Sequence, residues 1–239
     1  MASCRRRGGW SCVPEGHSLV LAARRLEPLV SQVVDSGPLA GERIVAVEAR
    51  GKHLLIHSDE RRVLDVHLGM HGSVRLAPPG AGRGRLVLRT AGGDAVIRAA
   101  RVRVSTESRL RLALGPDLLA DFDGDEFLRR VRLVDRPLGE ALLDQRVCAG
   151  IGNIAKSEAL WRCRADPFAA VSSFPDAALL EVAEAAAAIL GQGVEQHGRL
   201  PSQVYRRAGR PCPRCATEIR SAPQGEHRRT TYWCPSCQS

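Results

Sequence analysis

The chain has 239 residues, of which 44% are hydrophobic, so it can bury a core as one large domain or two smaller ones. Its formal net charge is +9, and 33 of its 35 basic residues are arginines, which suit phosphate recognition but can also reflect a GC-rich genome. No apolar run approaches the 18 residues of a membrane span, so we expect a protein of the reducing cytoplasm with no membrane partner.

Residues 1–12 match no regular element, and we expect them to be a disordered leader or a misassigned start. The segment VPEGH follows, beginning at Val13. Inside a chain it predicts only a loop. At an N-terminus, Pro14 would be a free secondary amine beside the carboxylate of Glu15, and such an amine condenses with an aldehyde to an iminium. Because GTG is a common alternative start codon, initiation at Val13 and loss of the initiator methionine would expose Pro14.

Apolar spacing predicts a helix over 18–34. Short runs with β character follow, separated by turns rich in glycine, proline and aspartate. These runs are 44–49, 53–57, 63–68, 73–76, 86–89 and 95–100. Their number and spacing predict a β-sandwich or a β-barrel.

Two residues of this β region stand out. Lys52 lies on the turn of GKHLL, where a solvated lysine is the ordinary interpretation. Met70 lies on the glycine-flanked loop HLGMHG. Most methionines belong to a core, but one on such a loop of a basic protein could be an apolar wedge between bases.

Near residue 115 the pattern becomes helical. The predicted helices are 124–131, 138–145, 154–164 and 176–190, the last with Asp176 as its N-cap and Gly191 as its stop. The motif GIGN, which contains Gly150, Gly152 and Asn153, precedes the third of them. Glycines let backbone approach a ligand, and free N–H groups at a helix start attract phosphate, although this motif is more often a simple turn.

Four cysteines near the C-terminus form two Cys-x-x-Cys pairs separated by 18 residues. They are Cys212, Cys215, Cys234 and Cys237. This spacing predicts one structural zinc ion held by a short hairpin, and the alternatives are two disulfides or four unrelated thiols. Eight arginines and only two glutamates lie between 199 and 229. A closed site of four cysteines leaves no open coordination position, so its role would be to hold a basic hairpin in shape.

Six motifs occur in one order: PEGH, GKHLL, HLGMHG, LLDQRVCAGIGNIAKSEALW, VYRRAGRPCPRC and RRTTYWCPSCQ. Together they closely resemble the formamidopyrimidine-DNA glycosylase and endonuclease VIII family, over nearly all of 13–238. PEGH is closer to the endonuclease VIII side of that family and HLGM to the formamidopyrimidine side. The first of these favours an endonuclease VIII-like member.

The resemblance implies an α+β protein of several domains. Residues 13–115 would form a catalytic β-sandwich with the first helix, 116–204 a helix–two-turn–helix DNA-binding domain, and 205–239 a zinc finger. The implied activity is that of a base-excision-repair DNA glycosylase with AP lyase activity, which acts through an N-terminal proline iminium followed by β- and δ-elimination. Its partner would be damaged double-stranded DNA, bound by a monomer at the nucleoid of a bacterial cytoplasm.

By the same resemblance, Pro14 would be the nucleophile and Glu15 the proton shuttle. Lys52 would contact a phosphate and assist proton transfer, and Arg229 would belong to the catalytic set as well as to the DNA grip.

The implied DNA contacts are Met70, which would fill the gap left by the extruded nucleotide, and Asn153 and Arg229, which would hold the phosphates flanking the lesion. Gly150 and Gly152 would lie in the same DNA-binding loop. The four cysteines would bind one structural Zn²⁺.

The chain departs from the family pattern in places. The stretch before GKHLL is short, which suggests a missing strand or loop, and Ser18 stands where a second carboxylate is common. Arg109 is a candidate for a further wedge residue. Two rival hypotheses follow: a DNA-binding relative that has lost lyase chemistry, and an unrelated zinc-ribbon protein of transcription or translation.

Overall fold

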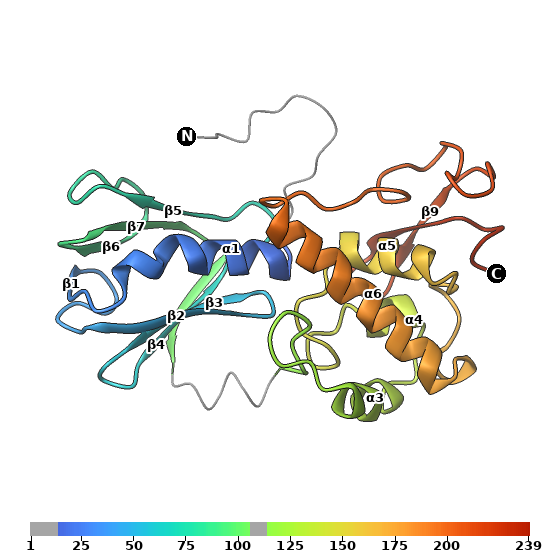
Figure 1. Ribbon diagram of the computed structural model, residues 1–239, viewed down its shortest axis with the longest axis horizontal. Coiled ribbons are helices and arrows are strands. Elements are labelled where there is room, and N and C mark those ends of the chain that lie inside the picture. Colours follow the sequence, from blue (N-terminus) through green and yellow to red (C-terminus); the bar gives the residue numbers. More distant parts are fainter. Residues whose placement is uncertain (1–13, 106–113) are drawn as a thin grey trace.

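A computed structural model gives the fold, and it describes residues 14–105 and 114–239. The expected leader 1–12 and the wedge candidate Arg109 lie outside the described residues. The molecule has two lobes, a β-sandwich with helix α1 and a helical lobe that carries the C-terminal hairpin (Figure 1).

The first lobe is built from two antiparallel sheets of four strands, ordered β1-β6-β7-β5 and β2-β3-β4-β8. Its elements are α1 (Gly16–Leu26), a 3-10 turn (Glu27–Leu29), β1 (Val34–Ser36), β2 (Ile44–Arg50), β3 (His53–Ser58), β4 (Val63–His67), β5 (Ser73–Ala77), β6 (Leu86–Thr90), β7 (Gly93–Arg98) and β8 (Arg101–Ser105). The helix lies between the sheets (Figure 1), because its apolar face, Leu19, Ala22, Ala23 and Leu26, packs into their shared core.

The structure corrects two expectations for this lobe. The helix predicted over 18–34 ends at Leu26, since Pro28 cannot continue helical hydrogen bonding, and the chain then forms β1. Strand β8 was missed because it is a largely exposed edge strand rich in arginine. The short stretch before GKHLL holds β1 and β2, and each sheet has four strands.

The second lobe contains α3 (Gly124–Arg132), α4 (Leu138–Ala141), α5 (Asn153–Arg162), a 3-10 turn (Val171–Ser173) and α6 (Asp176–Glu195). The helix predicted over 138–145 stops early, because the Asp144 carboxylate accepts the backbone N–H of Arg146, which competes with helical bonding. The stop predicted at Gly191 is also wrong. Helix α6 continues to Glu195, and Pro175 occupies the N-cap position expected for Asp176.

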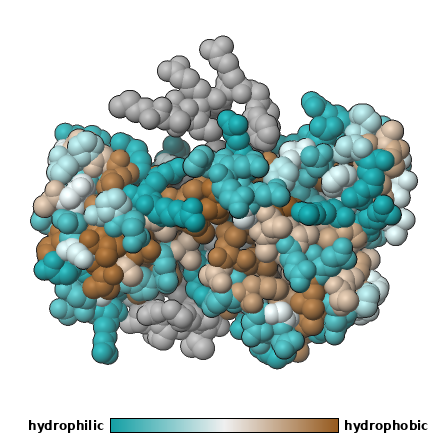
Figure 2. Space-filling view, viewed as in Figure 1, coloured by the Kyte–Doolittle hydropathy of each residue, from teal (hydrophilic) through white to brown (hydrophobic). Residues whose placement is uncertain are grey.

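Helix α6 is the one helix of the described residues that is long and apolar enough to cross a membrane by length and composition, with a mean hydropathy of 1.4. Its buried face packs against α5 and α1 in the core. Figure 2 shows apolar residues near the centre of one face, over the junction of α1 and α6, with hydrophilic residues around them.

The C-terminal hairpin pairs β9 (Arg220–Gln224) with β10 (Arg229–Trp233) in antiparallel register. Strand β10 packs against α5. The ring N–H of Trp161, on α5, lies 3.4 Å from the sulfur of Cys212, so the base of the hairpin rests on the helical lobe.

Asp117 links the lobes. It is buried, and its carboxylate accepts the backbone N–H groups of Gly51 at 2.5 Å and Leu119 at 2.9 Å. Burial raises the pKa of this carboxyl. Gly51 lies on the β2–β3 turn, immediately before Lys52, so this bond fixes the turn that carries the lysine.

We expect Asp117→Ala to lower the free energy of unfolding by about 1–3 kcal/mol, because the buried N–H of Gly51 and the partly buried N–H of Leu119 lose their acceptor. Chemical denaturation would measure the loss. Asp121→Ala is the matched control, since exposed Asp121 makes only a surface ion pair with Arg50, worth about 0–1 kcal/mol. Equal losses in the two variants would contradict the linking role of Asp117.

Candidate active site

Glu15 is the buried acid of the site. It precedes α1, and its side chain turns away from that helix to the start of α5. One carboxylate oxygen accepts the N–H of Ile154 at 2.7 Å and the other accepts the N–H of Ala155 at 3.1 Å. A helix N-terminus stabilises negative charge. The pKa of Glu15 is nevertheless raised by burial, against the opposing effects of Lys52 and of these N–H groups.

The backbone around Glu15 packs closely on the GIGN loop. The N–H of Gly16 donates to the carbonyl of Gly150 at 3.0 Å, and a Cβ on Gly16 would lie 3.1 Å from the Cα of Gly150. A Cβ on Gly152 would overlap the Glu15 carboxylate itself. These two glycines are therefore needed for contact between the lobes.

This geometry corrects one sequence interpretation. The sequence left open that the N–H groups at the start of α5 are free for phosphate, but those of Ile154 and Ala155 bind an internal carboxylate. Phosphate recognition by this loop would fall to the side chain of Asn153.

The charge of Lys52 interacts with the charges of Glu15 and Arg229 in the same site. Burial lowers its pKa to about 8; the Glu15 carboxylate opposes this shift, and the Arg229 cation adds to it. Lys52 comes from the sandwich and Arg229 from the hairpin, so three distant segments bring their charges together. Pro14, partly buried, directly precedes Glu15.

The expected DNA contacts also converge. Met70, Asn153 and Arg229 line one open cavity of about 550 Å³. The guanidinium of Arg229 lies 3.4 Å from the sulfur of Met70, and the Asn153 amide donates to the carbonyl of Thr230 at 2.7 Å. Met70 is 50% exposed, so it does not belong to the core and is free to act as a wedge.

The hairpin is attached to α5 by a residue that sequence analysis missed. Lys156 is fully buried, and its ammonium donates to the hydroxyl of Thr231 at 2.7 Å. That hydroxyl donates to the side-chain oxygen of Gln224 at 2.6 Å, which completes a chain across both hairpin strands. Lysine is rare in this sequence, and that scarcity was the one available signal.

Glu158 is a second residue that was missed. Its buried carboxylate accepts the backbone N–H groups of Gln203, Val204 and Tyr205 at 2.7–2.9 Å. Helix α5 therefore holds three parts of the chain in place: Glu15, strand β10 and the segment 203–205 that leads into the C-terminal hairpin. The side chain alone gave no signal, because its partners are backbone groups 45 to 47 residues away.

The four predicted cysteine ligands come together at the base of the hairpin. One sulfur from each of Cys212, Cys215, Cys234 and Cys237 lies within 4.8 Å of the others. Such a cluster can hold a metal ion.

Comparison with known proteins identifies the family. A family model described as the formamidopyrimidine-DNA glycosylase N-terminal domain matches residues 16–115, and one described as the formamidopyrimidine-DNA glycosylase H2TH domain matches 114–203. The chain is 36% identical to the probable endonuclease 8 2 of Streptomyces coelicolor, over 95% of this chain and 94% of that protein. The chain belongs to the formamidopyrimidine-DNA glycosylase family.

Further relatives agree. The formamidopyrimidine-DNA glycosylase of Thermus thermophilus is 34% identical over 95% of this chain and 98% of that protein. A crystal structure of the MutM (Fpg) protein from the same species has 31% identity and a TM-score of 0.78, covering 94% of this chain and 98% of that one. A Lactococcus lactis Fpg mutant in complex with Fapy-dG-containing DNA has 25% identity and a TM-score of 0.81, covering 95% of this chain and 100% of that one.

These findings confirm the resemblance and the fold class expected from the sequence, and they exclude an unrelated zinc-ribbon protein. The glycosylase and AP lyase function expected from the sequence is the function of this family. The residues that match the H2TH domain model include helices α3 to α6. Helix α5, which contacts Glu15, β10 and the segment before Arg206, therefore lies within that domain.

We expect Lys156→Met to change how stability depends on pH. Burial lowers the pKa of Lys156 to about 7, against an ordinary value of 10.5. The unfolded chain therefore binds more protons between these values, and this residue makes the wild type more stable as pH rises through that window. The Tm of Lys156→Met relative to wild type should be highest near pH 6.5 and should decline toward pH 10. A Tm difference that is independent of pH would contradict the assignment.

Proposed function

We propose that this protein is a bifunctional DNA glycosylase and AP lyase that removes oxidised bases from duplex DNA, with the Pro14 nitrogen as its nucleophile. The observation that carries the proposal is the Glu15 carboxylate, buried beside Pro14 and held by the N-terminus of α5. A carboxyl with a raised pKa next to an amine suits proton transfer during iminium chemistry.

The reaction requires a free amine at Pro14, so the active chain would begin there. The damaged nucleotide leaves the stack, because its sugar is unreachable inside a duplex. The Pro14 nitrogen attacks C1′, the base departs with a proton, and the opened sugar forms an iminium with Pro14. The iminium acidifies the C2′ proton; its removal expels the 3′ phosphate, and a second elimination expels the 5′ phosphate.

Glu15 and Lys52 would divide the proton transfers. Burial raises the pKa of Glu15, which favours its protonated form and suits it to proton exchange with the neighbouring amine. Lys52, with a pKa near 8, keeps much of its charge at pH 7 and can hold a phosphate while it exchanges a proton.

The cavity lined by Met70, Asn153 and Arg229 supports their proposed roles at the DNA. Met70 would occupy the space left by the extruded nucleotide, and Asn153 and Arg229 would hold the flanking phosphates. Gly150 and Gly152 would act in DNA binding by letting the loop pack against Glu15, which positions the neighbouring Asn153.

The metal is proposed to be one structural zinc ion. Sulfur–sulfur separations of 3.4 Å for Cys215–Cys234 and Cys215–Cys237, and of 4.0 Å for Cys212–Cys237, fit this proposal. Four thiolates about 2.3 Å from one ion in a tetrahedron are separated by about 3.8 Å. All four positions would be filled by protein, so the ion would support the hairpin and take no part in catalysis.

We further propose that the protein acts as a monomer at the nucleoid of a bacterial cytoplasm. Its named relatives are bacterial, and thiolate zinc ligands suit a reducing compartment. An endonuclease VIII-like member is the finer hypothesis, and PEGH favours it.

The first test of catalysis is borohydride trapping on an abasic duplex. Protein beginning at Pro14 should form a covalent adduct, and Pro14→Gly should form much less while its affinity for the duplex changes little. Ser18→Ala, outside the proposed chemistry, is the control. No adduct from the wild-type protein, together with retained DNA binding, would favour the non-catalytic relative instead.

We expect Arg229→Ala to weaken duplex binding and to reduce the slope of log K against log salt by about 0.9, the value of one phosphate contact. Binding titrations between 50 and 200 mM salt would measure it. An unchanged slope would remove Arg229 from the DNA interface.

Removal of the metal should abolish DNA binding before the sandwich unfolds, because the metal supports the hairpin while a separate core supports the sheets. Metal analysis should find one zinc per chain, and circular dichroism under chelation should retain the β signal. Full affinity without metal would contradict the structural role.

A further inference from the structure

Arg206 occupies a strained turn. The N–H of Arg207 donates to the carbonyl of Val204 at 3.1 Å, which closes a turn with Arg206 at its third position. The φ angle of Arg206 is +56°, in the left-handed region. A non-glycine residue costs about 1–2 kcal/mol there, whereas glycine would adopt the same backbone freely.

The surroundings hold this turn in place. The Glu158 carboxylate accepts the N–H groups of the three residues before Arg206. The ring of Tyr205 also packs edge-to-face on Tyr232 of β10, with centroids 5.2 Å apart. Strain that neighbouring contacts maintain in this way is typical of functional sites.

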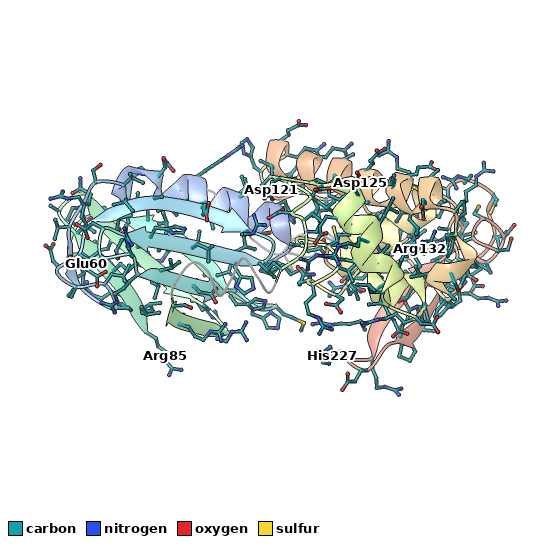
Figure 3. All side chains as sticks on the ribbon, turned by 90° about the horizontal axis from the view of Figure 1, so that it is seen from below. Glu60, Arg85, Asp121, Asp125, Arg132 and His227 are labelled. Carbon is teal, nitrogen blue, oxygen red and sulfur yellow. The ribbon has the colours of Figure 1, made fainter. Side chains whose placement is uncertain are left out.

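The side chain of Arg206 faces the proposed DNA site. Its guanidinium lies 5.6 Å from the centroid of the Tyr205 ring, and the residue lines the same cavity as Met70, Asn153 and Arg229. Among residues 14–105 and 114–239, no carboxylate forms an ion pair with it. Figure 3 shows His227, from the hairpin turn that lines this cavity, on the same side of the molecule as Arg85 of the sandwich.

We propose that Arg206 binds a DNA backbone phosphate other than the one held by Arg229, and that the left-handed turn is retained because it aims this guanidinium into the cavity. The aromatic ring supports the cation without neutralising it, so the charge stays available to an anion. This inference rests on the proposed function, because it assumes that the cavity receives DNA.

Arg206→Gly tests the inference sharply, since it removes the charge and relieves the backbone strain. In the full 239-residue chain, its Tm should match or exceed that of wild type. Affinity for a duplex with a tetrahydrofuran abasic analogue should fall about eightfold at 0.1 M salt, and the salt slope should fall by about 0.9. With protein beginning at Pro14, KM for an abasic duplex should rise while kcat stays unchanged.

Two matched controls exist. Arg61 and Arg164 are exposed arginines with φ of +58° and +57°. Arg61 adjoins Glu60, which lies at the far end of the sandwich (Figure 3). Arg164 follows the C-terminus of α5, the end of that helix opposite Asn153. Arg61→Gly and Arg164→Gly should relieve similar strain and leave DNA affinity and salt slope unchanged.

Three further results would decide the inference. Arg206→Gly combined with Arg229→Ala should reduce the salt slope by about two contacts, or about 1.8. If the salt slope of the double variant falls by only about 0.9, the value of one contact, the assignment of separate phosphates would be overturned. Arg206→Gly with the affinity and slope of Arg61→Gly would overturn phosphate binding by Arg206. Failure of the wild-type chain to bind any duplex would overturn the proposed function, and this inference with it.

Discussion

The structure depends on one interaction between its two lobes: the Glu15 carboxylate bound to the first N–H groups of α5. It joins residues 139 and 140 positions apart in the chain, and it satisfies a buried carboxylate and a helix terminus at the same time. The surrounding backbone admits no larger residue, since a side chain on Gly152 would occupy the space of this carboxylate. Any loss of this contact would leave two buried polar partners unsatisfied.

Because helix α5 binds the Glu15 carboxylate, the other contacts of α5 also position the active site. The same helix holds β10 through Asn153 and Lys156, and the segment before Arg206 through Glu158. The acid comes from the sandwich side and the arginines come from the zinc-finger region, yet both are positioned by about three turns of one helix. Relative displacement of the lobes is therefore limited at the place where the chemistry occurs.

The site also contains more positive than negative charge. Lys52, Lys156 and Arg229 face the carboxylates of Glu15 and Glu140, and burial lowers the pKa of both lysines. Such a site is electrostatically unfavourable until an anion arrives. The polyanionic backbone of DNA would supply that anion, so the same charges that destabilise the free protein would contribute to binding.

The sequence by itself determined the features that depend on local spacing. The two Cys-x-x-Cys pairs, the alternating β runs and the order of the motifs predicted the sandwich, the cysteine cluster and the family, because each is set by a few neighbouring residues. The resemblance to the family also named Glu15, Lys52, Met70 and Arg229, which the structure brings to one site.

Only the tertiary structure decided what depends on distant partners. Helix α6 passes Gly191 because its buried face continues to pack, and Lys156 becomes a buried link only because β10 covers it. The N–H groups of α5 bind Glu15 in preference to an external phosphate for a similar reason: the fold brings the carboxylate to them. Local spacing contains no information about partners that lie 75 to 139 residues away, so these assignments required the packed structure.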